Sequence, residues 1–125
     1  MHTILKYQKI HELALLALLG EEPEWSLFLY NDVIDAFKEA LLESETFVCE
    51  SHGSICGYLR AFVDAFGIYV SELYMSPQFR GNGFGAELLA KVKQEHPHQD
   101  VYVFSDEDLY YEQLGYKRVS SVFKL

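Results

Sequence analysis

The sequence predicts an α/β fold in which a single domain forms one mixed sheet. Apolar residues recur first at helical spacing, then in three strand-like stretches, and finally in alternating helices and strands. The 125 residues, half of them hydrophobic, suffice for one compact domain that buries about two-thirds of its unfolded surface. Pro23, Pro77 and Pro97 fall between predicted elements, and no repeat or linker divides the chain. We therefore expect one domain over residues 1–125.

The first third of the chain predicts one strand and two helices. Residues His2–Tyr7 alternate as in a strand, and Lys9–Leu19 carries apolar side chains along a helical stretch. A second helix is expected over Asn31–Glu43, with Asn31 or Asp32 as its N-cap. Its apolar residues recur at helical spacing: Val33, Ile34, Phe37 and Leu41.

The rest of the chain predicts an antiparallel meander followed by a β-α-β crossover. Aromatic and β-branched residues are enriched in three strands separated by short turns: Thr46–Glu50, Ile55–Val63 and Gly67–Met75. Phe84–Gln94 is a strong amphipathic helix, and Val101–Phe104 is expected to be a short buried strand. A short helix over Asp108–Leu114 and an alternating strand over Lys117–Leu125 complete the order β-α-α-β-β-β-α-β-α-β.

The formal net charge of −9 argues against a nucleic-acid partner, because such partners are bound by clustered lysine and arginine. An acidic surface concentrates cations and so slightly favours cationic substrates, although a solvated, soluble surface explains the same charge. The apolar run Leu13–Leu19 spans seven residues, far fewer than the roughly 20 that cross a bilayer. Its acidic flanks also differ from those of a signal peptide. We expect a cytoplasmic protein without a membrane partner.

Two cysteines flank the turn-like run Ser51–Ser54, and hairpin pairing about its centre would place Cys49 opposite Cys56. In a reducing cytosol, two buried thiols that act as small apolar residues are favoured over a disulfide. The cysteines and the five histidines show no metal-ligand spacing. We therefore expect no metal site.

A glycine-rich turn separates the strand that ends near Met75 from the helix that begins near Phe84. It consists of Arg80, Gly81, Asn82, Gly83, Phe84, Gly85 and Ala86. Glycines at alternate positions let the backbone approach a ligand closely and adopt positive φ. The free N–H groups of the first helical turn favour anionic oxygens, such as those of a pyrophosphate. The run has neither the Gly-Lys-Ser/Thr end of a Walker A loop nor the G-x-G-x-x-G spacing of a dinucleotide fold.

The turn resembles the R-x-x-G-x-G/A coenzyme A signature of the GCN5-related N-acetyltransferases (GNAT), and the surrounding Leu73–Leu89 resembles the family there as well. A second hallmark of the family, an aromatic-Tyr-x-x-x-Gly-aromatic run, is matched by Tyr110–Tyr116. The predicted element order is also similar to that of the family. This resemblance implies an N-acetyltransferase that uses acetyl-CoA as its cosubstrate.

Carried over residue by residue, the resemblance implies a binding site and a general acid. The backbone of Leu73 and Met75 would pair with the pantetheine arm, and N–H groups from Arg80 to Ala86 would hold the pyrophosphate. Tyr111 would stand near the sulfur and protonate the departing thiolate. The alternative for Tyr111 is a tyrosine that packs under the last strand.

Glu72 is the candidate general base, because only the neutral amine attacks a thioester. Strand alternation places Val70, Glu72 and Tyr74 on one face. The alternative is that Glu72 pairs with Arg60 or a lysine and binds nothing. The sequence leaves both interpretations open.

The acceptor pocket is expected to come from the two N-terminal helices and their loop. Aromatic and acidic residues gather in this region: Trp25, Phe28, Tyr30, Glu21, Glu22 and Glu24. Such a lining suits a cationic amine through cation–π contact and charge. The alternative is that Trp25 and Phe28 belong to the core and that the acids form a solvated loop.

The sequence thus predicts an N-acetyltransferase that moves an acetyl group to an amine by direct attack, with a small cationic amine favoured as the acceptor. A protein N-terminus or a lysine is an alternative acceptor. A second hypothesis is a non-catalytic CoA-binding regulatory domain of the same fold, and a third is a β-rich interaction module whose glycine run is only a turn. The final strand could pair with a second chain in a homodimer.

Overall fold

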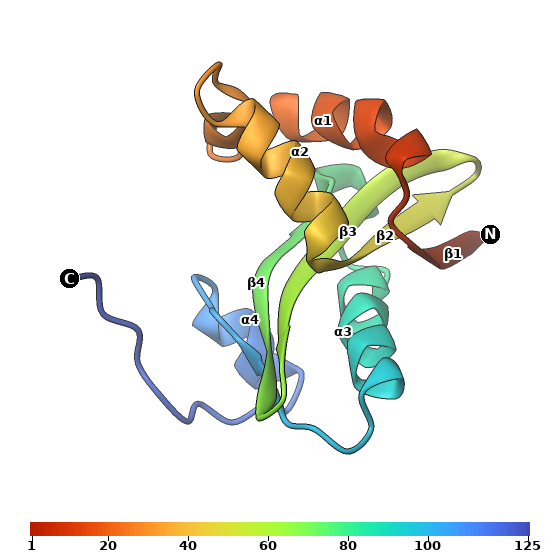
Figure 1. The fold of residues 1–125 in the computed structure, drawn as a ribbon. Helices are drawn as coiled ribbons and strands as arrows, with labels where there is room; N and C mark the ends of the chain where they lie inside the picture. Colours follow the sequence, from red (N-terminus) through yellow and green to blue (C-terminus); the bar gives the residue numbers. More distant parts are fainter.

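The computed structural model describes residues 1–125 and contains one five-stranded sheet (Figure 1). The strands follow the chain order across the sheet: β1 (His2–Lys6), β2 (Glu45–Ser51), β3 (Ser54–Asp64), β4 (Gly67–Met75) and β5 (Val101–Val103). Strands β1 to β4 are antiparallel, and β5 lies parallel to β4. The predicted mixed α/β fold, with its meander and its β-α-β crossover, is confirmed.

Helices cover both faces of the sheet (Figure 1). On one face lie α1 (Glu12–Gly20), preceded by a 3-10 turn (Lys9–His11), and α2 (Ile34–Glu43). On the other face lies α3 (Phe84–Glu95), which connects β4 to β5, and the short α4 (Asp108–Gln113) follows β5.

The sheet separates two apolar clusters. On the α3 side, Leu88 and Val92 are fully buried against the strands. On the α1–α2 side, Leu15 and Phe37 pack with Tyr58, which is also fully buried. The helical spacing of these side chains in the sequence places them on one face of each helix, and this face meets the sheet.

A β-bulge at Ser71 changes the phase of β4. Its pairing with β3 skips this one residue, and one extra residue exchanges the faces that the following side chains occupy. Val70 therefore joins the α3-side cluster, whereas Tyr74 packs on the α1–α2 side. The predicted common face of Glu72 and Tyr74 is confirmed, since Glu72 contacts Tyr58 on that side. The prediction that Val70 shares this face is wrong because of the bulge.

The predicted last strand, Lys117–Leu125, is not formed. After α4 the chain turns at Gly115 and runs to its end without helix or strand (Figure 1). The last backbone hydrogen bond joins Tyr116 N–H to Tyr111 C=O. A strand requires a neighbour that satisfies its backbone groups, and no strand of the same molecule lies beside this segment.

The absence of that strand leaves β5 at the edge of the sheet, so the prediction of a buried strand over Val101–Phe104 is also wrong. Its regular part has only three residues, and the Tyr102 and Phe104 side chains are 37% and 44% exposed. Successive side chains of a strand point to opposite faces. Val101 and Val103 pack against the α3-side cluster, whereas Tyr102 and Phe104 lie on the other face with Tyr69 and Phe62 and stay partly exposed.

The N-cap prediction for α2 is wrong as well. The helix begins at Ile34, with Val33 at the N-cap position and no side chain bonded to the cap. Asn31 and Asp32 lie in the preceding turn, in which the N–H groups of Val33 and Ile34 both donate to the Tyr30 carbonyl. The Tyr30 carbonyl therefore satisfies N–H groups at the helix start in place of a polar cap.

Cys49 and Cys56 are free, buried thiols, as predicted. They are not directly paired across the hairpin, because a bulge beside Cys49 aligns it with Gly57. The Cys56 thiol donates to the Cys49 carbonyl at 3.3 Å. Burial raises the pKa of Cys49 to about 12, so this thiol stays protonated and unreactive.

Candidate active site

The glycine-rich turn presents a row of free backbone N–H groups at the start of α3. Gly81 and Gly83 have φ of 84° and 79°, in the left-handed region, and a Cβ at either would have no neighbour within 4 Å. None of the N–H groups from Gly81 to Ala86 donates a hydrogen bond within the protein, whereas the Arg80 N–H donates to Pro77. Free N–H groups at a helix N-terminus fit anionic oxygens. The turn therefore suits a pyrophosphate.

Strands β4 and β5 separate beyond Val70. The last bond between them joins Phe104 N–H to Val70 C=O at 3.0 Å. Beyond it β4 continues to Met75 and pairs only with β3, so its other edge is free. The Met75 carbonyl turns toward this open edge, where it accepts a hydrogen bond from Arg80 Nε at 2.9 Å. Leu73, two residues earlier, has the same orientation. An extended ligand could thus lie along the free edge of β4, next to the glycine-rich turn.

Arg80 links the glycine-rich turn to residues on the α1–α2 side of the sheet. Its guanidinium lies 5.8 Å from the centre of the Tyr74 ring, and Nη2 lies 3.8 Å from Glu22 Oε1. The side chain is more than half exposed, so solvent screening keeps its contribution to stability small. It nevertheless holds a positive charge at the mouth of the site.

Glu72 is buried on the α1–α2 side of the sheet, where its carboxylate accepts hydrogen bonds from three donor atoms. Its Oε1 accepts from the Tyr58 hydroxyl at 3.0 Å and from Arg60 Nε at 2.7 Å, and its Oε2 accepts from Arg60 Nη2 at 2.6 Å. Glu72 is only 8% exposed. Burial, followed by the charge of Glu72, raises the pKa of Tyr58 well above its usual value. The ion pair with Arg60, one of the two interpretations that the sequence left open, is therefore present.

We expect Arg60→Met to lower the free energy of unfolding by about 3–5 kcal/mol, because it leaves a buried carboxylate without its cation. The double variant R60M/E72M should regain most of this loss, since it removes both charges. Urea unfolding followed by circular dichroism measures the cycle. Arg118→Met is the control, because Arg118 belongs to ion pairs that are more than half exposed. Purely additive losses in the double variant would contradict the coupling.

Tyr111 lies on α4 and packs against the α3-side cluster. Leu73, Met75 and Phe84 pack against the same cluster. Its hydroxyl makes no hydrogen bond within the protein and is not among the fully buried, unpartnered polar atoms, so it is free to donate to a ligand. Burial, and then the nearby Tyr110, raises the pKa of Tyr111. The phenol therefore keeps its proton at neutral pH.

Tyr110 also reaches the site, which the sequence did not indicate. A Cβ added at Gly85 would lie 2.5 Å from the Tyr110 hydroxyl oxygen and 3.9 Å from the Leu73 side chain. The two tyrosine rings meet edge to face, with their centres 5.1 Å apart. The small residue at position 85 thus lets α4 approach the start of α3.

The N-terminal loop contributes one carboxylate to the same region. Tyr74 donates its hydroxyl to Glu22 Oε1 at 3.1 Å, and the Trp25 ring lies 5.2 Å from that of Tyr74. Burial, followed by the hydrogen bond to Glu22, raises the pKa of Tyr74 to about 12. Trp25 and Phe28 are half-buried against the α1–α2-side cluster. Core packing therefore accounts for these two rings, while Glu22 faces the mouth of the site.

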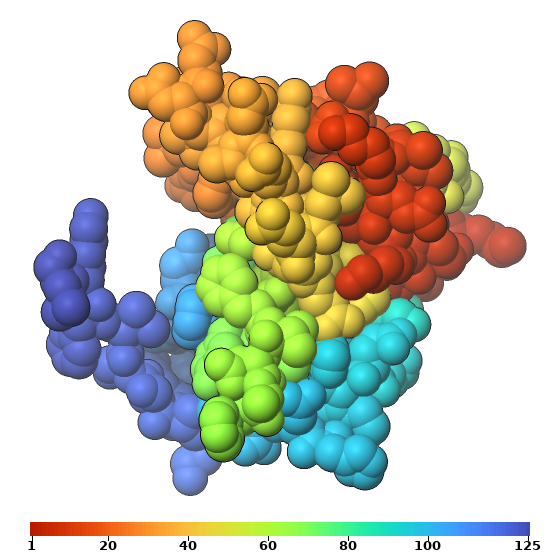
Figure 2. Space-filling model, viewed as in Figure 1, coloured from red at the N-terminus to blue at the C-terminus, as the bar shows by residue number.

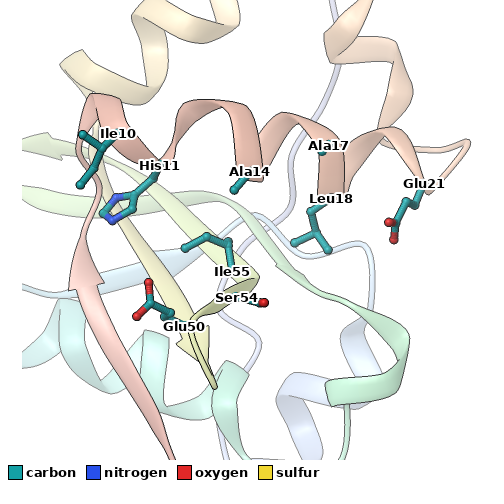
Figure 3. A pocket seen from close by; sticks show the side chains of 10 residues that line it. Ile10, His11, Ala14, Ala17, Leu18, Glu21, Glu50, Ser54 and Ile55 are labelled. Carbon is teal, nitrogen blue, oxygen red and sulfur yellow. The ribbon is translucent and has the colours of Figure 1, made fainter.

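A separate groove of about 500 Å³ lies between α1 and the β2–β3 hairpin. Figure 3 shows His11, from the 3-10 turn, and Leu18, from α1, facing Glu50 and Ile55 of the hairpin. None of the residues that the sequence assigns to cofactor binding lines this groove. It is therefore distinct from the site at the edge of β4.

Two further findings concern metal ligands and membranes. Histidine, cysteine and acidic side chains nowhere form a group of three or more that could hold a metal ion. None of the helices has both the length and the apolar character that a bilayer crossing requires.

A splayed parallel pair of strands beside a glycine-rich helix start is the architecture of acetyltransferase domains that bind coenzyme A. The sequence model of the acetyltransferase (GNAT) domain matches residues 43–118, which is more than half of the chain. The chain therefore belongs to the GNAT family, as the two motifs indicate. A search of curated proteins found no match.

Solved structures share the fold over the full length of the chain. The aminoglycoside N-acetyltransferase AAC(6′)-Iy in complex with CoA is similar with a TM-score of 0.80 and 15% identity, and the match covers 100% of this chain and 93% of that one. A GNAT family acetyltransferase from Streptococcus pneumoniae gives 0.75 and 17%, with 100% and 98% covered. A transcriptional regulator from Bacillus halodurans gives 0.77 and 18%, with 100% and 99% covered.

The structure brings together most of the residues that the sequence predicts, and it adds others. Leu73, Met75 and Tyr111 each pack against the α3-side cluster, and the glycine-rich turn leads into α3 of that side. The contacts of Tyr58, Tyr74 and Tyr110 were not predicted. Only the placement of Tyr74 on the face of Glu72 offered a signal, because strand alternation reveals a shared face but not the loop that covers it.

Proposed function

We propose that the protein transfers the acetyl group of acetyl-CoA to the amine of a small cationic molecule. The observation that carries the proposal is the position of the free β4 edge. The glycine-rich turn with its free N–H groups follows β4 in the chain. The same strand carries Glu72, and its Tyr74 hydroxyl donates to Glu22. One side of this edge suits an anionic cosubstrate, and the other suits a cationic acceptor.

In the proposed reaction the neutral amine nitrogen attacks the thioester carbonyl, and collapse of the tetrahedral intermediate breaks the C–S bond to give a thiolate. The attacking nitrogen loses one proton as it becomes the amide, and this loss balances the proton that the thiolate gains. Tyr111 supplies a hydrogen bond to the departing sulfur. A thiol of the cysteine type has a pKa of about 8.5, and the pKa of Tyr111 is raised by burial. Tyr111 therefore stabilises the thiolate as a hydrogen-bond donor that stays protonated, and the thiolate then takes its proton from solvent.

Glu72 is the proposed base for the ammonium of the acceptor. Its Oε2 receives a single hydrogen bond, from Arg60, and so keeps a lone pair for the amine or for a bridging water. Arg60 and Tyr58 hold the carboxylate in one orientation. A fixed carboxylate next to the free β4 edge is suited to removing the proton before attack.

Glu22 is the proposed anchor for the positive charge of the acceptor. Its side chain is 26% exposed, and it lies beside the Tyr74 hydroxyl and near Trp25. A carboxylate next to aromatic rings attracts an ammonium through charge and cation–π contact. Because the fold is similar to that of aminoglycoside acetyltransferases, aminoglycosides are the first class of cation to test as acceptors.

The proposal is tested by thermal shift with acetyl-CoA, NAD or ATP, and by thiol release with three acceptors: an aminoglycoside, spermidine and a lysine-containing peptide. We expect stabilisation by acetyl-CoA alone and turnover of the small cations. Glu22→Gln should raise KM for the cation about tenfold, the size of one charged hydrogen bond of about 1.5 kcal/mol. Glu24→Gln is the control, because Glu24 lies exposed in the same loop. An unchanged KM in E22Q would remove Glu22 from the acceptor site.

A second candidate is a non-catalytic CoA-binding regulatory domain, which the fold shared with a transcriptional regulator favours. Stabilisation by acetyl-CoA without turnover of any acceptor would support it. Turnover of the peptide alone would indicate a protein N-terminal or lysine acetyltransferase instead. No response to acetyl-CoA would contradict all three functions.

A further inference from the structure

The groove between α1 and the β2–β3 hairpin is a second candidate binding site. Its volume of about 500 Å³ falls in the range of ligand sites in proteins. In Figure 3, Glu50 and Glu21 lie toward opposite ends of the groove, with apolar side chains between them. In the space-filling view of Figure 2, α1 belongs to the red surface near the N-terminus. The apolar lining consists of Ile10, Ala14, Ala17, Leu18 and Ile55.

The α1 helix leaves apolar surface uncovered beside this groove. After Glu12 it contains only leucine, alanine and a final glycine. A helix that is apolar on all sides is normally buried on all sides. Here Leu13 is 81% exposed, and Ala14 and Ala17 are exposed as well. Uncovered apolar surface of this kind marks an interaction site when polar groups at its rim can orient a partner.

His11 directs a hydrogen-bond donor into the groove. The residue is only 9% exposed, and its Nδ1 accepts from the Gln8 N–H at 2.9 Å. An imidazole that accepts at Nδ1 carries its hydrogen at Nε2. This Nε2 makes no hydrogen bond within the protein, and it is not among the fully enclosed, unpartnered atoms. A buried side chain with an unused donor at a groove fits a ligand that brings an acceptor, such as a peptide carbonyl.

The charges at the groove favour a cationic ligand. Neither Glu50 nor Glu21 takes part in an ion pair. No lysine or arginine lines the groove, and Lys9, which precedes it in the chain, lies 3.3 Å from Glu12. Two carboxylates without a cation attract positive charges and repel anionic partners such as nucleic acid or an acidic membrane.

The length of the groove indicates the size of a bound segment. The ten residues from His11 to Glu21 advance about 15 Å at the 1.5 Å rise of a helix. An extended peptide rises about 3.3 Å per residue, so four or five residues cover this length. Its side chains alternate between two faces. Two basic residues four positions apart therefore share a face with the residue midway between them.

We propose that the groove binds an extended segment of a partner protein that carries two basic residues four positions apart and an apolar residue midway. The basic side chains pair with Glu50 and Glu21. A backbone carbonyl of the segment accepts from His11 Nε2, and the apolar residue covers Ala14 and Leu18. The groove is separate from the edge of β4, so this binding does not depend on acetyl transfer.

The first test titrates three dye-labelled peptide amides with the full chain and follows fluorescence anisotropy without acetyl-CoA. We expect Lys-Ala-Leu-Ala-Lys to bind with a Kd below about 1 mM, and added salt should weaken this binding. Glu-Ala-Leu-Ala-Glu lacks the positive charges, and Lys-Ser-Ser-Ser-Lys lacks the apolar residue. Both should bind at least about tenfold more weakly. Equal binding of the three peptides, or no binding of the first, would overturn the proposal.

Two variants of α1 locate the peptide. Ala14→Lys places bulk and a positive charge in the groove, and it should weaken binding of Lys-Ala-Leu-Ala-Lys about tenfold or more. Leu13→Lys is the matched control, because the neighbouring residue adds the same charge to the same helix but does not line the groove. It should change the Kd by no more than about twofold. Both positions are exposed, so both variants should fold. Equal Kd values in the two variants would contradict the groove as the site.

The remaining arms test the named carboxylate and the other possible sites. Glu50→Gln should weaken binding about tenfold, the effect of one charged hydrogen bond. Saturating acetyl-CoA and Glu22→Gln should leave the Kd unchanged, because the residues of the β4 edge do not line the groove. Displacement by acetyl-CoA, or an unchanged Kd in E50Q, would overturn the proposal. Self-association of the wild type that Ala14→Lys abolishes would show that a second copy occupies the groove, and would overturn it too.

Discussion

Gly83→Val is expected to abolish acetyl-CoA binding while leaving the fold in place. The residue has a φ of 79° and is the N-cap of α3, within the row of free N–H groups. A β-branched side chain resists this backbone conformation at a cost of about 1–3 kcal/mol. It also projects over the N–H groups that suit the pyrophosphate. The stabilisation by acetyl-CoA in a thermal shift titration should disappear.

Gly53→Val provides a matched control for this variant. Gly53 has a φ of 80°, its Cβ would also meet nothing within 4 Å, and it lies in the turn between β2 and β3, away from the site. Both variants should lose a similar few degrees of melting temperature from backbone strain. Only Gly83→Val should lose the response to acetyl-CoA. Equal responses in the two variants would show that the glycine-rich turn is merely structural.

Tyr111→Phe is expected to lower kcat about a hundredfold, the lower end of the range for a positioned acid or base. The hydroxyl makes no hydrogen bond within the protein, so its removal should leave both stability and acetyl-CoA binding nearly unchanged. Steady-state kinetics by thiol release, together with the thermal shift titration, separates the two effects. A variant as active as the wild type would exclude Tyr111 as the donor to the departing thiolate.

The pH dependence provides a second measure of Tyr111. Burial raises the pKa of this phenol above its usual value of 10.0. The protonated form, which donates to the thiolate, therefore persists as the pH rises through 10. We therefore expect that Tyr111 causes no fall in the wild-type rate below pH 10. If the rate does fall there, the same fall should be present in Tyr111→Phe. Tyr110→Phe is the control, and it should cost no more than about threefold, well below the range for a positioned acid. A larger loss in Y110F than in Y111F would mean that Tyr110, and not Tyr111, is the donor to the thiolate.

Local pattern explains why the predicted helices were confirmed in their main span. Phe37 and Leu41, or Leu88 and Val92, recur at a spacing that places them on one helical face wherever the helix lies. The glycine-rich turn is also local, because positive φ and a free helix start depend on neighbouring residues only. These features could therefore be predicted from the sequence.

The sequence left the pairing of Glu72 with Arg60 as one of two open interpretations and could not decide between them, because the environment of Glu72 depends on pairing between strands. The bulge at Ser71 sets which side chains join it, and the match of β3 to β4 places Arg60 at its side. The alternation of residues along β4 predicts neither this bulge nor the match of the two strands. In the same way, the contact of Glu22 with Tyr74 joins residues 52 positions apart, and such a contact exists only after the loop has packed on the sheet.

By itself, the sequence determined the family, the order of the elements except the last, and the position of the glycine-rich turn. Each of these depends on residues that are close along the chain or on a motif of fixed spacing. The tertiary structure decided that Glu72 is paired with Arg60 and that Tyr110 reaches Gly85. It also decided that Lys117–Leu125 has no partner in its own molecule. An alternating pattern specifies a strand, but only a neighbouring edge with free backbone groups can make it one.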